Sequence, residues 1–309
     1  MAHLLTTRPE IFIPGITKGV QLYDLSPTLA VWSDSITARM SCNDRGEIKL
    51  ISHGDLQLPS PFGGTVGPMS EVDYDIVYPR SYKPVRIGAK HSVDQLAMQI
   101  EHIGDGGKSS IIKALSSKFG LSYTNYKNMA AADLFNGGFS TSTTSDGVAG
   151  FSNSHLLASG TFSNRGDGSV DLGLSYSALE VARGRMMETL SHRGNPAPIA
   201  GPYRLHVPVA LEALANRLTG ATLMPSSNNN DPNYVGKKMK VVCNPWYTSD
   251  TAWGLQAVNS EYHNMFYVEQ RAFKITMAPD PDYDTMRYYT SASFGFGWHD
   301  WRGFWGTTG

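Results

Sequence analysis

The stretch Asp146-Gly-Val-Ala-Gly-Phe-Ser-Asn-Ser-His155 decides how the rest of the chain is interpreted. It brings an Asp-Gly pair, which favours a turn, together with a Phe-Ser pair and a histidine. A Ser-Asn loop follows at 163–164, and Leu205-His-Val-Pro208 opens a further helical pattern. Each piece is common by itself, so the information lies in their order and spacing.

A long helical pattern precedes this stretch. Ser92-Val-Asp-Gln95 has the form of a capping box, and apolar residues recur at helical spacing from Val93 onward. Gly120 weakens the middle of the pattern, and we expect a bend there. The pattern ends before Gly137-Gly138, as helices commonly do at glycine.

Further upstream, the sequence predicts an arm followed by a long excursion. Residues 1–35 lack sustained periodicity, whereas alternating apolar residues predict strands near 36–42, 48–50 and 74–87. The Pro/Gly-rich loop at 53–70 is too long for a compact domain unless it has a function. The apolar side chains at its tip are Leu58, Phe62, Val66 and Met69. Because they have no local apolar partner, we expect them to contact another subunit.

Downstream, Ser177-Ala-Leu-Glu180 is a second capping box. Pro208 stands where proline is tolerated, in the first turn of a helix predicted over Val209–Leu218. Gly220 is predicted to cap the end of that helix.

The last part of the chain is predicted to be β-rich. Residues 273–277 alternate, 279–284 form a turn, and a long strand follows. Its apolar face is formed by Tyr288, Thr290, Ala292, Phe294, Phe296 and Trp298. Two paired strands of this kind can bury one face against a long helix.

Composition narrows the classes of function. The net charge of −1 comes without a basic stripe that would neutralise phosphates, which argues against a sequence-specific DNA binder. Charged residues are 17% of the chain, against about 25% in an ordinary domain, as expected where surface is buried between subunits. Cys42 and Cys243 cannot form a disulfide framework. We find no signal peptide and no apolar run long enough to span a bilayer.

Two patterns only resemble ligand sites. His102-Ile-Gly-Asp-Gly-Gly-Lys-Ser109 ends like a phosphate-binding loop but has histidine where the pattern needs glycine. Asp280, Asp282 and Asp284 have the spacing of a calcium loop, yet Thr285 occupies its glycine position. We expect no cofactor, no metal and no enzymatic activity.

His155 and the aromatic run near the C-terminus each leave two interpretations. His155 either makes a structural hydrogen bond that fixes its turn or forms a dyad with Ser152 or Ser154. Trp298, Trp301, Phe304 and Trp305 either stack on sugars or bases or pack in the core and interfaces, and the scarcity of nearby cations favours packing.

The order of these motifs resembles the central region of tailed-bacteriophage major capsid proteins with the HK-97-like fold, particularly the Mu-like head-protein branch. In such proteins an Asp-Gly, Phe-Ser, His segment closes the long spine helix, and a Val-Pro pair, here Val207-Pro208, starts a helix of the axial domain. Val241-Val-Cys-Asn-Pro245 fits the next strand. The resemblance covers roughly 90–309. It implies that Asp146, Gly147 and His155 form a structural turn.

The resemblance implies an α+β fold in five parts. They are an N-terminal arm (1–35), an extended loop with its base strands (36–91), the spine helix of a peripheral domain (92–145), an axial domain (146–260) and C-terminal strands of the peripheral domain (261–309).

It also implies a virion subunit, assembled in the host bacterial cytoplasm, that forms pentamers and hexamers of an icosahedral shell around packaged double-stranded DNA. The expected partners are other copies of the chain, a separate scaffolding protein, a portal, in some cases a decoration protein, and DNA contacted non-specifically, with no membrane. The alternatives are an encapsulin-type compartment shell and a β-rich hydrolase with an unrecognised site.

The family's archetype links a lysine of the extended loop covalently to an asparagine of the peripheral domain. Here residues 51–79 contain no lysine, and residues 265–309 contain no asparagine. We therefore expect a shell that is held together without covalent cross-links.

Overall fold

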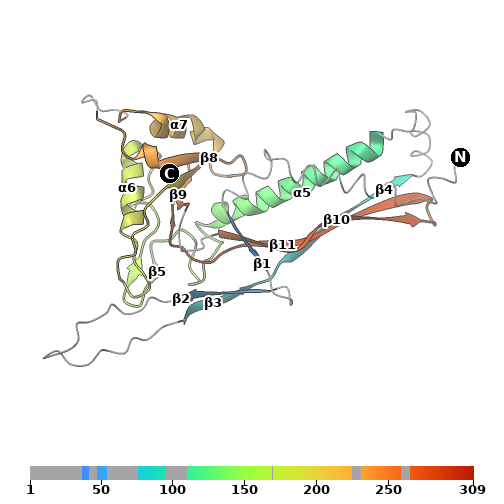
Figure 1. The fold of residues 1–309 in the computed structure, drawn as a ribbon, viewed down its shortest axis with the longest axis horizontal. Helices are drawn as coiled ribbons and strands as arrows, with labels where there is room; N and C mark the ends of the chain where they lie inside the picture. Colours follow the sequence, from blue (N-terminus) through green and yellow to red (C-terminus); the bar gives the residue numbers. More distant parts are fainter. Residues whose placement is uncertain are drawn as a thin grey trace.

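The computed structural model describes residues 37–41, 47–53, 76–94, 110–168, 170–224, 231–258 and 265–309. The molecule is elongated (Figure 1). A long helix lies along one sheet, a second sheet with two helices stands at one end, and a two-stranded ribbon projects from the body (Figure 1). Helices and strands both contribute, which confirms the α+β class.

The peripheral sheet has the strand order β1 (Ala38–Ser41), β10 (Met265–Asp280), β11 (Thr285–Trp298), β4 (Val85–Asp94). Only β1 runs parallel to its neighbour among these pairs. Helix α5 (Ser110–Gly137) packs on the sheet through Tyr123, whose ring contacts Phe273 and Phe294. The predicted hairpin along a long helix is therefore confirmed.

The predicted helix start at Ser92 is wrong. Val93 pairs with Met286, so this segment completes strand β4 instead, and residues 95–109 lie outside the described ranges. Helix α5 runs without interruption through Gly120, and Figure 1 shows the helix as a straight ribbon, without the expected bend. Its end at Gly137 agrees with the sequence prediction.

The axial sheet has the order β12 (Phe304–Thr307), β9 (Trp253–Ala257), β7 (Tyr203–Val207), β8 (Met239–Cys243). This part also contains helices, short 3-10 turns and a pair of two-residue strands. The helices are α6 (Tyr176–Met187) and α7 (Glu212–Gly220), the 3-10 turns are η1 (Val209–Leu211) and η2 (Gly236–Lys238), and the strands are β5 (His155–Leu156) and β6 (Thr161–Phe162). Trp253, Leu205 and Leu179 are fully buried in its core.

Two predicted helix caps differ from the structure. Ser175, not Ser177, caps α6, because the Ser175 hydroxyl accepts a hydrogen bond from the Ala178 amide at 3.2 Å. Gly220 is the last residue of α7 and is not left-handed, and the chain leaves through extended Ala221. The helical start after Pro208 is confirmed, with η1 forming the first turn.

The end of the chain corrects one predicted boundary. Strand β12 pairs with β9, so residues 304–307 belong to the axial sheet and not to the peripheral domain. The assignment of all of 261–309 to the peripheral domain is wrong in this last strand.

The projecting ribbon consists of β2 (Ile48–His53) and β3 (Ile76–Tyr82), which pair antiparallel. It carries the sequence segment that contains Leu58, Phe62, Val66 and Met69. These four residues and the arm at 1–35 lie outside the described ranges. Within the described ranges, no helix is both long and apolar enough to cross a membrane.

Candidate functional site

The turn after α5 is built by Asp146 and Gly147. Gly147 adopts a left-handed φ of +82°, and its amide donates to the Thr144 carbonyl at 3.0 Å. Asp146 Oδ1 accepts from the Val148 amide at 3.1 Å and from the Thr144 hydroxyl. The carboxylate thus closes its own turn, as Asp side chains commonly do.

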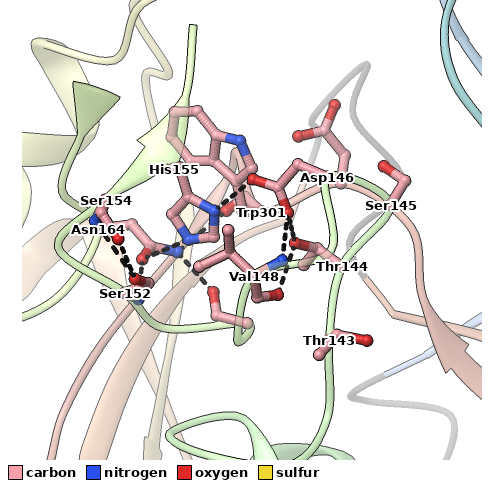
Figure 2. Close-up of polar contacts among 12 residues, drawn as sticks. Thr143, Thr144, Ser145, Asp146, Val148, Ser152, Ser154, His155, Asn164 and Trp301 are labelled. Carbon is pink, nitrogen blue, oxygen red and sulfur yellow. Dashed lines mark hydrogen bonds and ion pairs between the residues drawn. The ribbon is translucent and has the colours of Figure 1, made fainter. Parts of the chain in front are cut away.

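The two ends of the stretch 146–155 meet in the interior. His155 Nδ1 lies 2.8 Å from Asp146 Oδ2, and the two side chains are 0% and 1% exposed. His155 Nε2 lies 3.0 Å from Oδ1 of Asn164 (Figure 2). The imidazole therefore bridges the turn at Asp146 and the loop at Asn164.

The hydrogen bonds of Asn164 fix the orientation of its amide and the proton on Nε2 of His155. Asn164 Nδ2 donates to the carbonyls of Gly150 at 2.8 Å and Phe304 at 3.0 Å, and its Oδ1 accepts from the Ser152 amide at 2.8 Å. This fixes the amide orientation, so Oδ1 accepts from His155 as well. The other nitrogen, Nδ1, faces the buried Asp146 carboxylate at 2.8 Å.

The pKa of Asp146 supports the charged state. Burial opposes its ionisation, but the hydrogen bond and charge of His155 and the hydrogen bonds from Thr144 and Val148 outweigh burial and lower the pKa. A carboxylate with several donors is ionised at neutral pH.

Trp301 covers this pair. Its ring stacks on His155 with centroids 4.7 Å apart and planes 12° apart, and Phe162, the cross-strand partner of His155, lies 5.3 Å from the same ring. The predicted packing role of the aromatic run is confirmed, because all its members are buried. They are Trp298, Trp301, Phe304 and Trp305.

The geometry rules out the serine–histidine dyad. Both ring nitrogens of His155 are engaged by Asp146 and Asn164, and the hydroxyls of Ser152 and Ser154 face each other at 3.3 Å (Figure 2). Across the ranges that the structure describes, no group of three or more His, Cys, Asp or Glu residues could hold a metal ion.

Asn164 is the functional residue that the sequence did not reveal. Its side chain joins residues 150 and 152 to the C-terminal segment, and its backbone carbonyl accepts from the Gly306 amide at 3.1 Å. In the sequence it is only the second residue of a Ser-Asn loop. No local pattern distinguishes it from a solvated loop asparagine.

A second buried histidine, His206, is held by uncharged partners. His206 Nε2 lies 2.9 Å from Gln256 Oε1, and Nδ1 lies 3.3 Å from the Tyr247 hydroxyl. Burial lowers the pKa of His206 to about 4, so the ring is neutral at physiological pH. One nitrogen donates to Gln256 and the other accepts from Tyr247.

Residues 78–306 match the family model described as phage capsid protein. No curated protein sequence matches the chain. Among solved structures, the fold resembles a protein of Mycobacterium phage Patience, with 11% identity and a TM-score of 0.52 over 93% of this chain and 87% of the other. The capsid of an empty GTA particle has 12% identity and a TM-score of 0.53 over 89% and 88%.

The holo-SrpI encapsulin complex of Synechococcus elongatus PCC 7942 is also similar, with 11% identity and a TM-score of 0.53 over 90% and 86% of the two chains. At such identities these likenesses concern the fold alone, and they agree with the HK-97-like arrangement of spine helix, peripheral sheet and axial domain. The family model, by contrast, spans well over half of the sequence. The chain therefore belongs to the phage capsid protein family.

Proposed function

We propose that this chain is the major head subunit of a tailed phage, many copies of which form the pentamers and hexamers of an icosahedral shell around double-stranded DNA. The observation that carries the proposal is the family match over 78–306. The elongated body with a projecting ribbon supports it, because such a shape offers much surface for contact with neighbours (Figure 1). The order of motifs supports placement in the Mu-like branch.

The junction of Asp146, Gly147 and His155 has a structural role in this proposal. It fixes the end of α5 against β5 and, through Asn164, against the segment that enters β12. Buried, mutually satisfied polar groups specify one arrangement of the elements they join. A subunit in a closed shell needs a fixed angle between its peripheral and axial parts, and the junction supplies it.

The extended loop acts as a brace between subunits through Leu58, Phe62, Val66 and Met69. The paired strands β2 and β3 connect this loop to the body. A groove of about 370 Å³ between α5 and the peripheral sheet, lined by residues that include Phe119, Tyr123 and Phe273, is a surface on which apolar side chains of another copy fit.

Charge supports the same contact. The segment 54–75 contains acidic residues but neither lysine nor arginine, whereas Arg86 lines the groove. Opposite charges on two surfaces favour their encounter and fix their relative position.

Other partners follow from the role of the shell. A separate scaffolding protein guides assembly in the host bacterial cytoplasm, a portal occupies one vertex, and a decoration protein binds the outside in some relatives. DNA is contacted non-specifically, because a net charge of −1 without a basic stripe provides little phosphate neutralisation.

Electron microscopy of the purified protein tests the proposal. Closed icosahedral particles or sheets of hexamers are the expected result. A preparation that contains only small, monodisperse monomers under all assembly conditions contradicts it.

An encapsulin-type compartment is the second candidate, and the fold likeness to the Synechococcus encapsulin is the observation in its favour. The contents of purified shells separate the two functions. Nuclease-protected double-stranded DNA supports the phage head, and enzyme cargo without DNA supports the compartment.

A further inference from the structure

The root of the projecting ribbon is fastened to the body at three successive points of β3. The first is Tyr82, whose ring packs edge-on against Phe266 with centroids 4.6 Å apart and whose hydroxyl donates to the Trp298 carbonyl. Burial raises the pKa of Tyr82 to about 12, so the hydroxyl keeps its proton. This contact fixes the ribbon to the peripheral sheet.

The second point is Arg80. Its guanidinium donates to the carbonyls of Thr143 at 2.8 Å and Thr144 at 2.6 Å, and to the Thr143 hydroxyl at 3.1 Å. Thr144 in turn donates to the Asp146 carboxylate. Arg80 therefore binds the ribbon to the turn that carries the buried His155 pair.

The third point is Tyr78, which lies in a β-bulge. Leu50 pairs with Arg80 whereas Ser52 pairs with Val77, so two residues of β3 oppose one residue of β2. Tyr78 has a left-handed φ of +51°, which is rare for a bulky residue. Bulges bend a strand and redirect a side chain.

The redirected Tyr78 ring reaches the axial part of the subunit. It lies edge-on to the His192 ring, with centroids 5.5 Å apart and planes at 89°. His192 belongs to the connection between α6 and β7, far in sequence from the ribbon. The ribbon is thus in contact with the peripheral sheet, the junction and the axial part within five residues of β3.

We propose that Arg80 and Tyr78 are positioning residues for shell assembly, which set the direction in which the extended loop leaves the subunit and hence the angle between neighbouring subunits. This inference rests on the proposed function, in which the loop contacts a neighbouring copy. The two contacts made by these residues are polar or edge-on aromatic contacts at the surface of the body. They can be weakened without removing a core side chain.

The test compares full-length Arg80→Gln and Arg80→Lys with the unsubstituted protein. Gln loses the charge and most of the donors, so we expect unassembled subunits that fold normally but exchange the backbone amides of β2 and β3 at least tenfold faster. Their particles should show a broad range of diameters or open sheets. Lys keeps the charge and can donate to one or both carbonyls. Part of the Arg80→Lys particles should therefore have the uniform diameter of the unsubstituted shell.

His192→Ala provides an independent variant, because it removes the aromatic partner of Tyr78 from the axial side and leaves β3 unchanged. If Arg80→Gln fails to fold, the particle diameters of His192→Ala alone test the proposal. Lys83→Gln is the matched control: Lys83 lies at the root of the same ribbon, but its ion pair is with Glu47, at 2.8 Å, beside the start of β2. Its particles should keep the normal diameter.

Particles of normal, uniform diameter from both Arg80→Gln and His192→Ala would overturn this inference. That result is distinct from a failure of the proposed contact between the loop and a neighbouring copy, which is tested separately by assembly of the Phe62→Asp variant. If Phe62→Asp assembles normally, the contact of the loop with its neighbour is wrong, whatever the Arg80 variants do.

Discussion

The Nε2 atom of His155 lies 3.0 Å from Oδ1 of Asn164, and both side chains are buried. The amide nitrogen of Asn164 faces the carbonyls of Gly150 and Phe304, so the amide cannot turn over without opposing like groups. One asparagine thereby joins the buried histidine to the C-terminal segment.

Asn164→Asp should strongly destabilise the subunit. The carboxylate has nearly the shape of the amide, but it replaces a donor by an acceptor opposite the carbonyls of Gly150 and Phe304. Each buried acceptor left without a donor costs about 1 to 3 kcal/mol. We expect the free energy of unfolding of the unassembled subunit, measured in urea, to fall by roughly 3 kcal/mol or more. Exposed Asn153→Asp is the control, and equal losses from both variants would contradict the role of Asn164.

Asp146 and His155 should behave as an energetically coupled pair. His155→Gln alone leaves the buried Asp146 carboxylate without its partner, which typically costs about 3 to 5 kcal/mol, and Asp146→Asn alone removes the carboxylate that faces His155 Nδ1. The double variant removes both members of the pair, and its loss should be smaller than the sum of the single losses by more than about 1 kcal/mol. A double-mutant cycle in urea measures this. Ser154→Ala should change stability by less than about 0.5 kcal/mol, and a large effect would show that the exposed Ser154 hydroxyl takes part in the buried network.

Stability should fall as the pH is lowered from neutral. The folded protein holds the pKa of His206 near 4, below its usual 6.5, so between these values the unfolded chain binds a proton that the folded protein does not. The stabilisation is therefore present above pH 6.5 and is lost as the pH falls toward 4, by roughly 3 kcal/mol. The lowered pKa of Asp146 acts in the same direction at still lower pH.

Urea unfolding at several pH values between 7.5 and 4.5 checks this dependence. In His206→Gln the loss between pH 6.5 and 4 should be much smaller, because the titrating group is gone. An unchanged slope in this variant would show that other groups control the acid response.

Phe62→Asp should leave the subunit folded and block or weaken shell formation. A charge buried in an interface without a partner costs on the order of 2 to 5 kcal/mol. Circular dichroism of the subunit and electron microscopy of the particles are the two measurements. Phe62→Leu keeps an apolar side chain and should assemble. Normal particles from Phe62→Asp would show that the loop tip faces solvent.

Mature virions boiled in denaturing detergent should give one band near 33.7 kDa. Three asparagines remain possible acceptors for a cross-link: Asn128 is fully buried, the Asn136 amide is engaged with Trp246 and Thr248, and Asn264 lies outside the described ranges. Among the lysines near the loop base, Lys83 pairs with Glu47. A ladder of multimers that survives reductant would contradict the prediction.

The alternation of apolar and polar residues predicted those elements in which buried and exposed side chains follow each other at regular spacing. The alternation from Tyr288 to Trp298 identified β11, because every second side chain of a half-buried strand faces the core. The same reasoning failed at Ser92–Asp94, where a capping-box pattern also fits the end of a strand. Pairing of Val93 with Met286, far along the chain, decided between the two, and local spacing contains no information on such a partner.

The junction at Asp146 and His155 was likewise predicted only in part from the sequence. Asp146, Gly147 and His155 were identified from the order of motifs, and the structure brings Asp146 and His155 together. Asn164 was not identified as part of it, because its partners at Gly150 and Phe304 are 14 and 140 residues away. A hydrogen-bonding centre of this kind is defined by the tertiary arrangement and leaves no periodic trace in the sequence.

The place of β12 in the chain has a consequence for biosynthesis. Trp298 and Phe304 fill the core beside α5, and Trp305 fills the core of the axial sheet. A ribosome makes this segment after every other described strand, so a nascent chain halted before Trp298 has neither core complete. Neither core can therefore close until this segment has been made.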